Sequence, residues 1–405
     1  MQSVLKKIKP DQKEVKRVQK VVQTFLKKIT PHLGKGIPIL GGSYAKGTWL
    51  KNNHDIDVFV AYPDNDQLSE RLFSSLKKSF KKVEQIHGSR DYFHVSFQGL
   101  AFELVPVHKI TKPEEALNVT DVSLLHVVWV LEHLDSRLAD DVRLLKQFCT
   151  AQGVYGAETY QKGFAGYVLE ILTIYYGSFF NVLKHSLTWK EGMTIDVTAK
   201  GNITDPNKLS ALNVVDPVQP SRNAAAALSA EKMRKFQDAA RGYLHELVKE
   251  TTASFFVPQK ISLVTLKKTN SLVLLATPKV GKEDVIGTKL LKAHEFLITH
   301  LNTEGYVVKK QYWVWEGKKV YFCYQLKLTK LPLTFEHQGP PLQKEADVVK
   351  FKMKHTGKKF FQKDGRIFVQ LKRTYPTLKQ FLQALFKDTY LKERVKTIKI
   401  ISLKR

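Results

Sequence analysis

Two aspartates stand two residues apart in an otherwise apolar segment, "DIDVFVAY" (55–62), which has the composition of a β-strand. Side chains alternate between the two faces of a strand, so Asp55 and Asp57 share one face and Ile56 takes the other. A third carboxylate, Glu103, lies in a second apolar segment, "LAFELVPV" (100–107). If these two strands are neighbours, three carboxylates gather on one face of a sheet.

Three carboxylates on neighbouring strands are what two-metal phosphoryl transfer requires. Unpaired carboxylates raise one another's pKa, and bound Mg²⁺ removes that repulsion. We therefore expect Asp55, Asp57 and Glu103 to be catalytic and to bind two Mg²⁺ ions. One ion would activate a hydroxyl nucleophile, and the other would hold a triphosphate and the leaving pyrophosphate.

A glycine turn precedes the first acidic strand. Gly41 and Gly42 allow the backbone to approach a ligand closely, and Ser43 and Thr48 offer hydroxyls at an expected helix start, a natural anion site. The turn is not a Walker A loop, because Thr48 stands where that loop requires lysine. An Asp-Ile-Asp strand alone is more often a solvated edge, and Gly-Gly-Ser alone is usually a simple turn. Their order and spacing together indicate nucleotide chemistry.

Hydrophobic periodicity predicts a multidomain α/β (α+β) protein with three parts. Residues 1–115 mix helices and strands around a small mixed sheet, residues 116–258 are mainly helical, and residues 259–405 alternate strands and helices. The more specific local predictions are strands over 37–40 and 55–62, a hairpin turning at 98–99, a helix capped by Thr120, one continuous helix over 163–185, a helix beginning at Ser221 and a strand over 261–268.

The positive charge of the chain is concentrated in its last part. The formal net charge is +27, and residues 259–405 hold 31 Lys and Arg against 11 Asp and Glu, an excess of 20. Lysines alternate there with aromatic residues on predicted hairpins. An ordinary amphipathic sheet with lysines that discourage edge pairing fits this pattern, but the excess favours contact with RNA phosphates. We expect Lys358 and Lys359 to bind RNA.

Membrane and disulfide signals are missing from the sequence. No apolar run reaches the roughly 18 residues that span a bilayer, and the first residues lack the apolar core of a signal peptide. Cys149 and Cys323 have neither metal-site spacing nor a disulfide framework. We expect a cytoplasmic protein with reduced thiols and no membrane partner. The sequence leaves the oligomeric state open, with a homodimer among the options.

Three longer stretches resemble a known family: "GSYAKGTWL…HDIDVFV", "DDVRLLKQF…GVYGAETYQKGFAGYVLEIL" and "DPVQPSRNAAAALS". They are similar, in order over about residues 35–260 and loosely beyond, to the archaeal, class I CCA-adding tRNA nucleotidyltransferases of the DNA polymerase β-like superfamily. The resemblance implies a catalytic head (1–115), a helical neck with the nucleotide pocket (116–258), and a basic body and tail (259–405) that bind the acceptor and T-stem region of tRNA. It implies an enzyme that adds the 3′-terminal CCA from CTP and ATP without a nucleic-acid template and releases pyrophosphate.

The resemblance also assigns roles to single residues. Asp55, Asp57 and Glu103 match the metal-binding carboxylates, although relatives commonly carry Asp where Glu103 stands. The positions that match nucleotide-binding residues are Gly42, Ser43, Lys46, His126, Lys146, Tyr155 and Arg222. Among them, Lys146 and Tyr155 match triphosphate binders, and Arg222 matches the residue that reads the incoming base. From residue type alone, His126 would be a core histidine, Lys146 a solvated charge and Tyr155 a buried turn aromatic.

Two other functions stay open at this point. A poly(A) or oligoadenylate polymerase of the same superfamily would share the carboxylates but not the stretches "RNAAAALS" and "GVYGAE". A non-catalytic RNA-binding protein with a relic site would not need all three acidic positions, which this chain fills.

Overall fold

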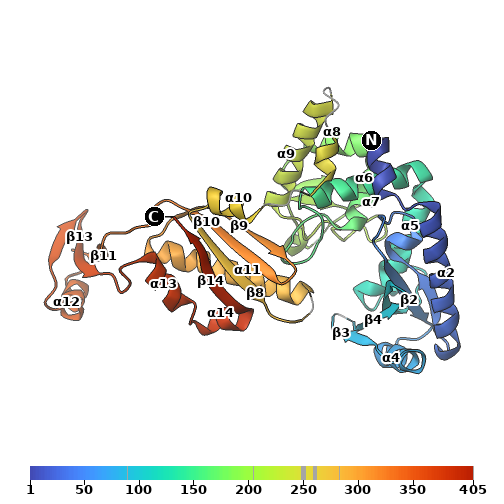
Figure 1. The fold of residues 1–405 in the computed structure, drawn as a ribbon, viewed down its shortest axis with the longest axis horizontal. Helices are drawn as coiled ribbons and strands as arrows, with labels where there is room; N and C mark the ends of the chain where they lie inside the picture. Colours follow the sequence, from blue (N-terminus) through green and yellow to red (C-terminus); the bar gives the residue numbers. More distant parts are fainter. Residues whose placement is uncertain (89, 204, 248–251, 259–261, 282, 405) are drawn as a thin grey trace. The chain divides into compact units, whose positions relative to one another are not determined.

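Contacts within the chain divide it into two units, Met1–Gln259 and Lys260–Arg405. The computed structural model describes residues 1–405 except 89, 204, 248–251, 259–261, 282 and 405 (Figure 1). The further division of the first unit at residue 115, expected from the sequence, stays a prediction.

A five-stranded sheet of order β1-β2-β5-β4-β3 forms the first part of this unit. Its strands are β1 (Ile37–Leu40), β2 (Asp55–Tyr62), β3 (Glu84–Ile86), β4 (Tyr92–Phe97) and β5 (Leu100–His108). β2 and β5 run parallel, and the other neighbouring pairs are antiparallel. The predicted strands over 37–40 and 55–62 are confirmed. The predicted hairpin is confirmed too, with Gln98 and Gly99 both at positive φ in its turn.

Helices α2 (Gln12–Ile29) and α4 (Leu68–Ser79) pack on one face of this sheet, as Figure 1 shows for α2. Asp11 caps α2, because its side chain accepts from the Glu14 N–H at 2.9 Å. The shared core joins apolar residues of both helices to those of β2, β4 and β5, including Val22, Phe25, Leu72, Ile56, Phe93 and Phe102. Because alternate strand residues point into this core, their neighbours in sequence are directed to the opposite face.

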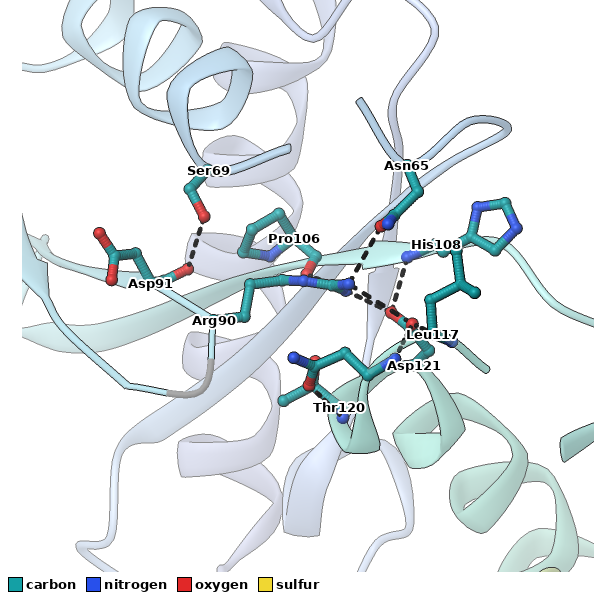
Figure 2. A network of polar contacts seen from close by, with 10 residues as sticks. Asn65, Ser69, Arg90, Asp91, Pro106, His108, Leu117, Thr120 and Asp121 are labelled. Atoms are coloured by element: carbon teal, nitrogen blue, oxygen red, sulfur yellow. Dashed lines mark hydrogen bonds and ion pairs between the residues drawn. The ribbon is translucent and has the colours of Figure 1, made fainter. Parts of the chain in front are cut away.

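A buried ion pair connects the end of β5 with the segment that contains Asp121. Arg90 pairs with Asp121, whose carboxylate is fully buried and also accepts from the backbone N–H of His108 at 2.9 Å (Figure 2). Arg90 reaches further to the carbonyl of Pro106 at 3.2 Å and to Asn65 at 3.1 Å. The fully buried carboxylate of Asp121 is thus satisfied by several donors, so the network holds the sheet and the following segment in one arrangement.

The rest of the first unit is mainly helical. Its helices are α1 (Gln2–Ile8), α3 (Gly42–Ala45), α5 (Ser123–His133), α6 (Ser136–Ala151), α7 (Gly166–Tyr176), α8 (Phe179–Ser186) and α9 (Ala230–Glu246). Its described part also contains short elements: the 3₁₀ helices η1 (Thr30–His32), η2 (Pro113–Glu115), η3 (Val119–Val122), η4 (Pro206–Lys208) and η6 (Thr252–Phe256), and the parallel strands β6 (Met193–Ile195) and β7 (Leu212–Val214). Helices α6 to α9 share one large apolar core.

Three of the local helix predictions were wrong. The expected helix over 163–185 is two helices, because Gly177 adopts a left-handed φ of 78° and Ser178 caps α8. Thr120 is not a helix cap: it lies inside η3, whose N-cap is Asn118. The helix expected from Ser221 begins only at Ala230, because residues 221–229 form turns.

The second unit is built on an antiparallel sheet of order β14-β8-β10-β9. Its strands are β8 (Leu272–Pro278), β9 (Val308–Glu316), β10 (Lys319–Leu326) and β14 (Val395–Leu403), with helices α10 (Leu263–Thr269), α11 (Glu283–Glu304), α13 (Leu378–Leu385) and α14 (Thr389–Arg394). The expected strand over 261–268 was wrong in its described part, since Ser262 caps the helix α10. Residue 261 itself lies outside the described residues.

A smaller sheet of order β11-β13-β12 also belongs to this unit, with β11 (Thr334–Pro341), β12 (Phe360–Lys363), β13 (Arg366–Lys372) and helix α12 (Glu345–Lys354). The predicted fold class, a multidomain mixture of helices and sheets, is confirmed. None of the described helices is long and apolar enough to cross a bilayer.

Candidate active site

The acidic side chains meet on the sheet face opposite α2 and α4. Asp57 lies beside Glu103 in the parallel register of β2 and β5, and Asp55 precedes it on the same face of β2. The antiparallel register of β4 and β5 adds His94 beside Glu103, with 2.8 Å between His94 Nε2 and Glu103 Oε2. The structure therefore brings the three predicted carboxylates together and adds a histidine that the sequence did not reveal.

The charge of Asp57 is only partly compensated. Burial raises its pKa to about 6, the nearby carboxylates of Glu103 and Asp55 add to that rise, and the ammonium groups of Lys46 and Lys146 oppose it. A buried carboxylate among like charges is stabilised by a cation, and oxygen donors of this kind suit a divalent metal ion. These residues thus fit such an ion chemically. Within the described part of the chain, no three His, Cys, Asp or Glu side chains already stand in a metal-binding arrangement.

The glycine turn touches Asp57 directly. Gly42 adopts a φ of 56°, and a Cβ on it would lie 1.5 Å from Asp57 Oδ2, so only glycine fits at this position. The Gly41 N–H donates to the carbonyl of Asp57 at 2.9 Å. Gly42 and the partly exposed Ser43 begin the short helix α3. The turn is thus built against the acidic face, as the sequence predicts.

Two of the predicted nucleotide-binding residues, Lys46 and Lys146, meet at a buried carboxylate. Glu170 on α7 accepts from Lys46 Nζ at 2.8 Å, Lys146 Nζ at 3.0 Å and the Thr48 hydroxyl at 2.8 Å. Burial alone would raise the pKa of Glu170, but the two ammonium groups outweigh it and lower the pKa to about 2. Two expectations were therefore wrong: Thr48 is fully buried rather than placed at an anion site, and Lys146 is buried rather than solvated.

Tyr155 lies at the edge of the Glu170 cluster. A Cβ on Gly166 would be 3.1 Å from the Tyr155 hydroxyl oxygen and 3.5 Å from Lys146 Cε, so these two side chains converge on the start of α7. Burial raises the pKa of Tyr155, and the charge of Glu170 adds to the effect, so the phenol is neutral at physiological pH. A neutral phenol next to ammonium groups can donate a hydrogen bond to a phosphate oxygen.

His126 and Arg222 meet at a second buried carboxylate, Asp216. Arg222 donates from Nη1 to Asp216 Oδ2, and His126 Nε2 lies 2.9 Å from the same oxygen. The Tyr167 hydroxyl donates to Asp216 Oδ1 at 3.2 Å, and the Tyr167 ring lies 5.1 Å from Lys46 Nζ. Burial alone would raise the pKa of Asp216, but His126 and Arg222 lower it to about 2. Tyr167 therefore links the Asp216 and Glu170 clusters.

The predicted RNA-binding lysines belong to the second unit. Lys358 and Lys359 lie in the connection between α12 and β12, and both are exposed. Their backbones are held by hydrogen bonds to His355 and Gln370 at 3.1 Å. Their side chains are thus presented to solvent from an ordered connection.

Comparison with known proteins identifies the family. A nucleotidyltransferase domain matches residues 19–123, the second domain of tRNA nucleotidyltransferases matches 140–257, and the C-terminal domain of CCA-adding enzymes matches 269–397. The CCA-adding enzyme of Methanosarcina acetivorans is 31% identical over 423 residues, which cover 98% of this chain and 90% of that enzyme. The chain belongs to the archaeal-type CCA-adding enzymes. The predicted family and enzyme class are confirmed.

Other CCA-adding enzymes also match over most of this chain. The enzyme of Nanoarchaeum equitans is 33% identical over 380 residues, or 91% of each chain, and that of Sulfurisphaera tokodaii is 34% identical over 312 residues, or 76% of this chain and 73% of the relative. A solved structure of Cid1, described as having RNA terminal uridylyl transferase activity, aligns with a TM-score of 0.52 at 12% identity and covers 64% of this chain and 97% of its own. The latter likeness concerns the fold alone.

Four residues of the candidate site were not predicted from the sequence: His94, Tyr167, Glu170 and Asp216. Glu170 had a usable signal, because it is the only acid in an apolar helical stretch and a buried acid needs cationic partners. The other three carry no local pattern. They become visible only when the fold brings distant elements together.

Proposed function

We propose that this protein completes the 3′ end of tRNA by adding C, C and A from CTP and ATP without a nucleic-acid template. In each step the terminal 3′ hydroxyl attacks the α-phosphate of the nucleotide, and pyrophosphate leaves. The observation that carries this proposal is the convergence of Asp55, Asp57 and Glu103 on one sheet face against the Gly42 turn, in a chain similar to CCA-adding enzymes along nearly its whole length.

Divalent metal ions are general in the nucleotidyltransferase superfamily, and we propose two Mg²⁺ ions here, held by Asp55, Asp57 and Glu103. The chemistry they would supply when bound is activation of the 3′ hydroxyl and stabilisation of the charge that develops on pyrophosphate. Glu103 is paired with His94 at 2.8 Å, so this carboxylate is already oriented along the acidic face by its neighbour.

The triphosphate is assigned to the turn and to the Glu170 cluster. Gly42 and Ser43 offer backbone N–H groups at the start of α3, while Lys46 and Lys146 place positive charge close enough to oppose the rise in the pKa of Asp57. Tyr155 adds a neutral donor. Glu170 keeps both ammonium groups in place and offsets part of their charge before the nucleotide arrives.

Arg222 is assigned to the base, with His126 beside it. A guanidinium only donates hydrogen bonds. Cytosine N3 and adenine N1 are acceptors, whereas the corresponding nitrogens of uracil and guanine carry hydrogen. A donor held at that position therefore favours C and A over U and G, which matches the two nucleotides that the product requires.

The tRNA is assigned to the second unit, where Lys358 and Lys359 are exposed and the charge excess lies. A-form RNA is bound largely through shape, phosphates and 2′ hydroxyls, which suits a protein that accepts every tRNA. We expect the acceptor and T-stem region to be contacted. A cytoplasmic location and a homodimer both stay predictions.

Incorporation of labelled CTP into tRNA that lacks CCA tests this proposal. Asp55→Ala and Asp57→Ala should lower incorporation by at least about 10³-fold, because the charge that organises the reacting groups is lost. Asp66→Ala, which removes an exposed acid from a loop of the same unit, is the control and should keep activity. Chelation of Mg²⁺ should abolish incorporation. Equal activity of the wild type and either strand variant would refute the assignment of these carboxylates.

A further inference from the structure

Asp216 is a buried carboxylate with no part in the proposed reaction, yet it contacts three side chains of the nucleotide site. It is fully buried, whereas its partner Arg222 is 37% exposed, so the pair runs from the interior to the surface. His126 lies on the same carboxylate oxygen and Tyr167 on the other. A buried carboxylate with this many partners restrains the positions of all their side chains.

The loop between Asp216 and Arg222 is closed at its base. The Asp216 N–H donates to the carbonyl of Arg222 at 3.0 Å, and the Arg222 N–H donates to the carbonyl of Gln219 at 2.8 Å. The Val218 N–H donates to Asp216 Oδ1 at 2.9 Å. The loop "DPVQPSR" also contains two prolines, which restrict its backbone further. Both ends of the Arg222 side chain are therefore held: the backbone by the loop and the guanidinium by Asp216.

The guanidinium of Arg222 keeps donors for a ligand. Among the contacts of the described residues, only its Nη1 is used, and it is used for Asp216. A guanidinium has five N–H donors in a planar fork, so most of them stay available. An arginine that must order a long side chain on binding loses affinity and selectivity, and a carboxylate that fixes the fork beforehand avoids that cost.

We propose that Asp216 is a positioning residue for nucleotide selection. It holds the Arg222 fork, through the carboxylate oxygen that His126 also contacts, in the orientation that presents donors to the Watson–Crick edge of cytosine or adenine. This inference rests on the proposed function, in which Arg222 reads the base. It assigns the discrimination against uracil and guanine to the Asp216–Arg222 pair rather than to Arg222 alone.

The test is Asp216→Asn, with kcat/KM measured separately for CTP and UTP on tRNA that lacks CCA. Asparagine keeps a carbonyl oxygen that can accept from the Val218 N–H, but it turns an amide NH₂ group toward the nitrogens of Arg222 and His126. The preference for CTP over UTP should fall by about tenfold or more. Asp196→Asn is the matched control, because Asp196 also closes a turn, through the N–H groups of Thr198 and Gly201, and should leave the preference unchanged.

A double-mutant cycle separates positioning from simple loop support. If Asp216 acts through Arg222, then Asp216→Asn should change the preference no further in an Arg222→Ala background. An equal fall of kcat/KM for both nucleotides, with the preference intact, would overturn the inference. So would a further loss of preference in the Arg222→Ala background.

Two outcomes keep the inference and the proposed function distinguishable. A wild-type protein that adds no nucleotide refutes the proposed function, whereas a wild type that adds C, C and A beside an equally selective Asp216→Asn refutes only the inference. If Asp216→Asn does not fold, Asp216→Glu carries the test, because it keeps the charge and moves the carboxylate by one methylene. Its preference for CTP should also fall, and an unchanged preference contradicts the inference.

Discussion

At the scale of single residues, the tightest constraint on the site lies between Gly42 and Asp57. A Cβ on Gly42 would overlap Asp57 Oδ2. The Asp57 carboxylate can therefore occupy its position only because residue 42 is glycine and has no side chain. Gly47, five residues after Gly42, also has a positive φ, 65°, but beyond its own residue and its two chain neighbours no atom lies within 4 Å of its Cβ position. Alanine at either position would strain the backbone, but only alanine at position 42 would also collide with a residue of the site.

We predict that Gly42→Ala lowers kcat for CTP addition by about 10²-fold or more, because misplacement of a reacting group by about 1 Å has that effect. Gly47→Ala should only destabilise the fold, by about 1 kcal/mol, and keep most activity. Steady-state kinetics and thermal unfolding of both variants decide this. Similar kcat values for the two variants would contradict the proposed contact between the turn and the carboxylate.

At the scale of elements, Glu170 joins the glycine-turn segment to helices α6 and α7, since its partners Lys46 and Thr48 come from the segment and Lys146 from α6. The folded-state pKa of Glu170, about 2, lies below its usual value of 4.5. A lowered carboxyl pKa contributes stability that is present above pH 4.5 and is lost as the pH falls from about 4.5 toward 2.

We predict that Glu170→Gln destabilises the protein by about 3–5 kcal/mol at neutral pH, because it leaves buried ammonium groups without their partner. The free energy of unfolding of this variant should also depend less on pH between 4.5 and 2 than that of the wild type. Glu191→Gln, at an exposed ion pair with Arg234, is the control and should change stability little. Urea unfolding across that pH range measures both effects, and parallel curves for wild type and Glu170→Gln would contradict the account.

Much of the sheet and its acidic face could be predicted because the information is local. Alternation along 55–62 places Asp55 and Asp57 together whatever the rest of the chain does. The errors arose where tertiary contacts or a single turn residue determine the structure. One continuous helix was predicted over 163–185, although Gly177 divides it. A helix was predicted from Ser221, although residues 221–229 form turns and the helix begins at Ala230. Lysine burial at Lys146 depends on Glu170, 24 residues away, and no local pattern shows that pairing.

At the scale of the whole molecule, chemistry and RNA affinity are assigned to different units. Residues 259–405 carry an excess of 20 positive charges out of the net +27. An interface dominated by phosphates releases counterions, so the logarithm of affinity should fall with the logarithm of salt concentration by roughly 0.7–0.9 per phosphate neutralised. The salt dependence of tRNA binding therefore reports on the second unit.

We predict that reversing Lys358 and Lys359 to Glu weakens binding of all tRNAs alike and flattens the salt dependence, while the choice of nucleotide is unchanged. Lys81 and Lys82, an exposed pair in the first unit, serve as the matched control when both are changed to Glu. Their reversal should affect tRNA affinity less. The tRNA affinity of each variant is measured by titration at several salt concentrations. An equal loss of affinity for the two pairs would show that binding depends on the net charge of the protein and not on contacts made by the second unit.

The size of the product made from one tRNA shows directly whether the protein adds CCA. The protein is incubated with Mg²⁺ and tRNA that ends before CCA, with CTP alone, ATP alone, UTP alone, GTP alone, and CTP with ATP. We expect an extension of two nucleotides with CTP alone, of three with CTP and ATP together, and almost none with UTP or GTP. A long homopolymer made from ATP alone would identify a poly(A)-type polymerase instead, and binding of tRNA without any extension would identify a non-catalytic RNA-binding protein.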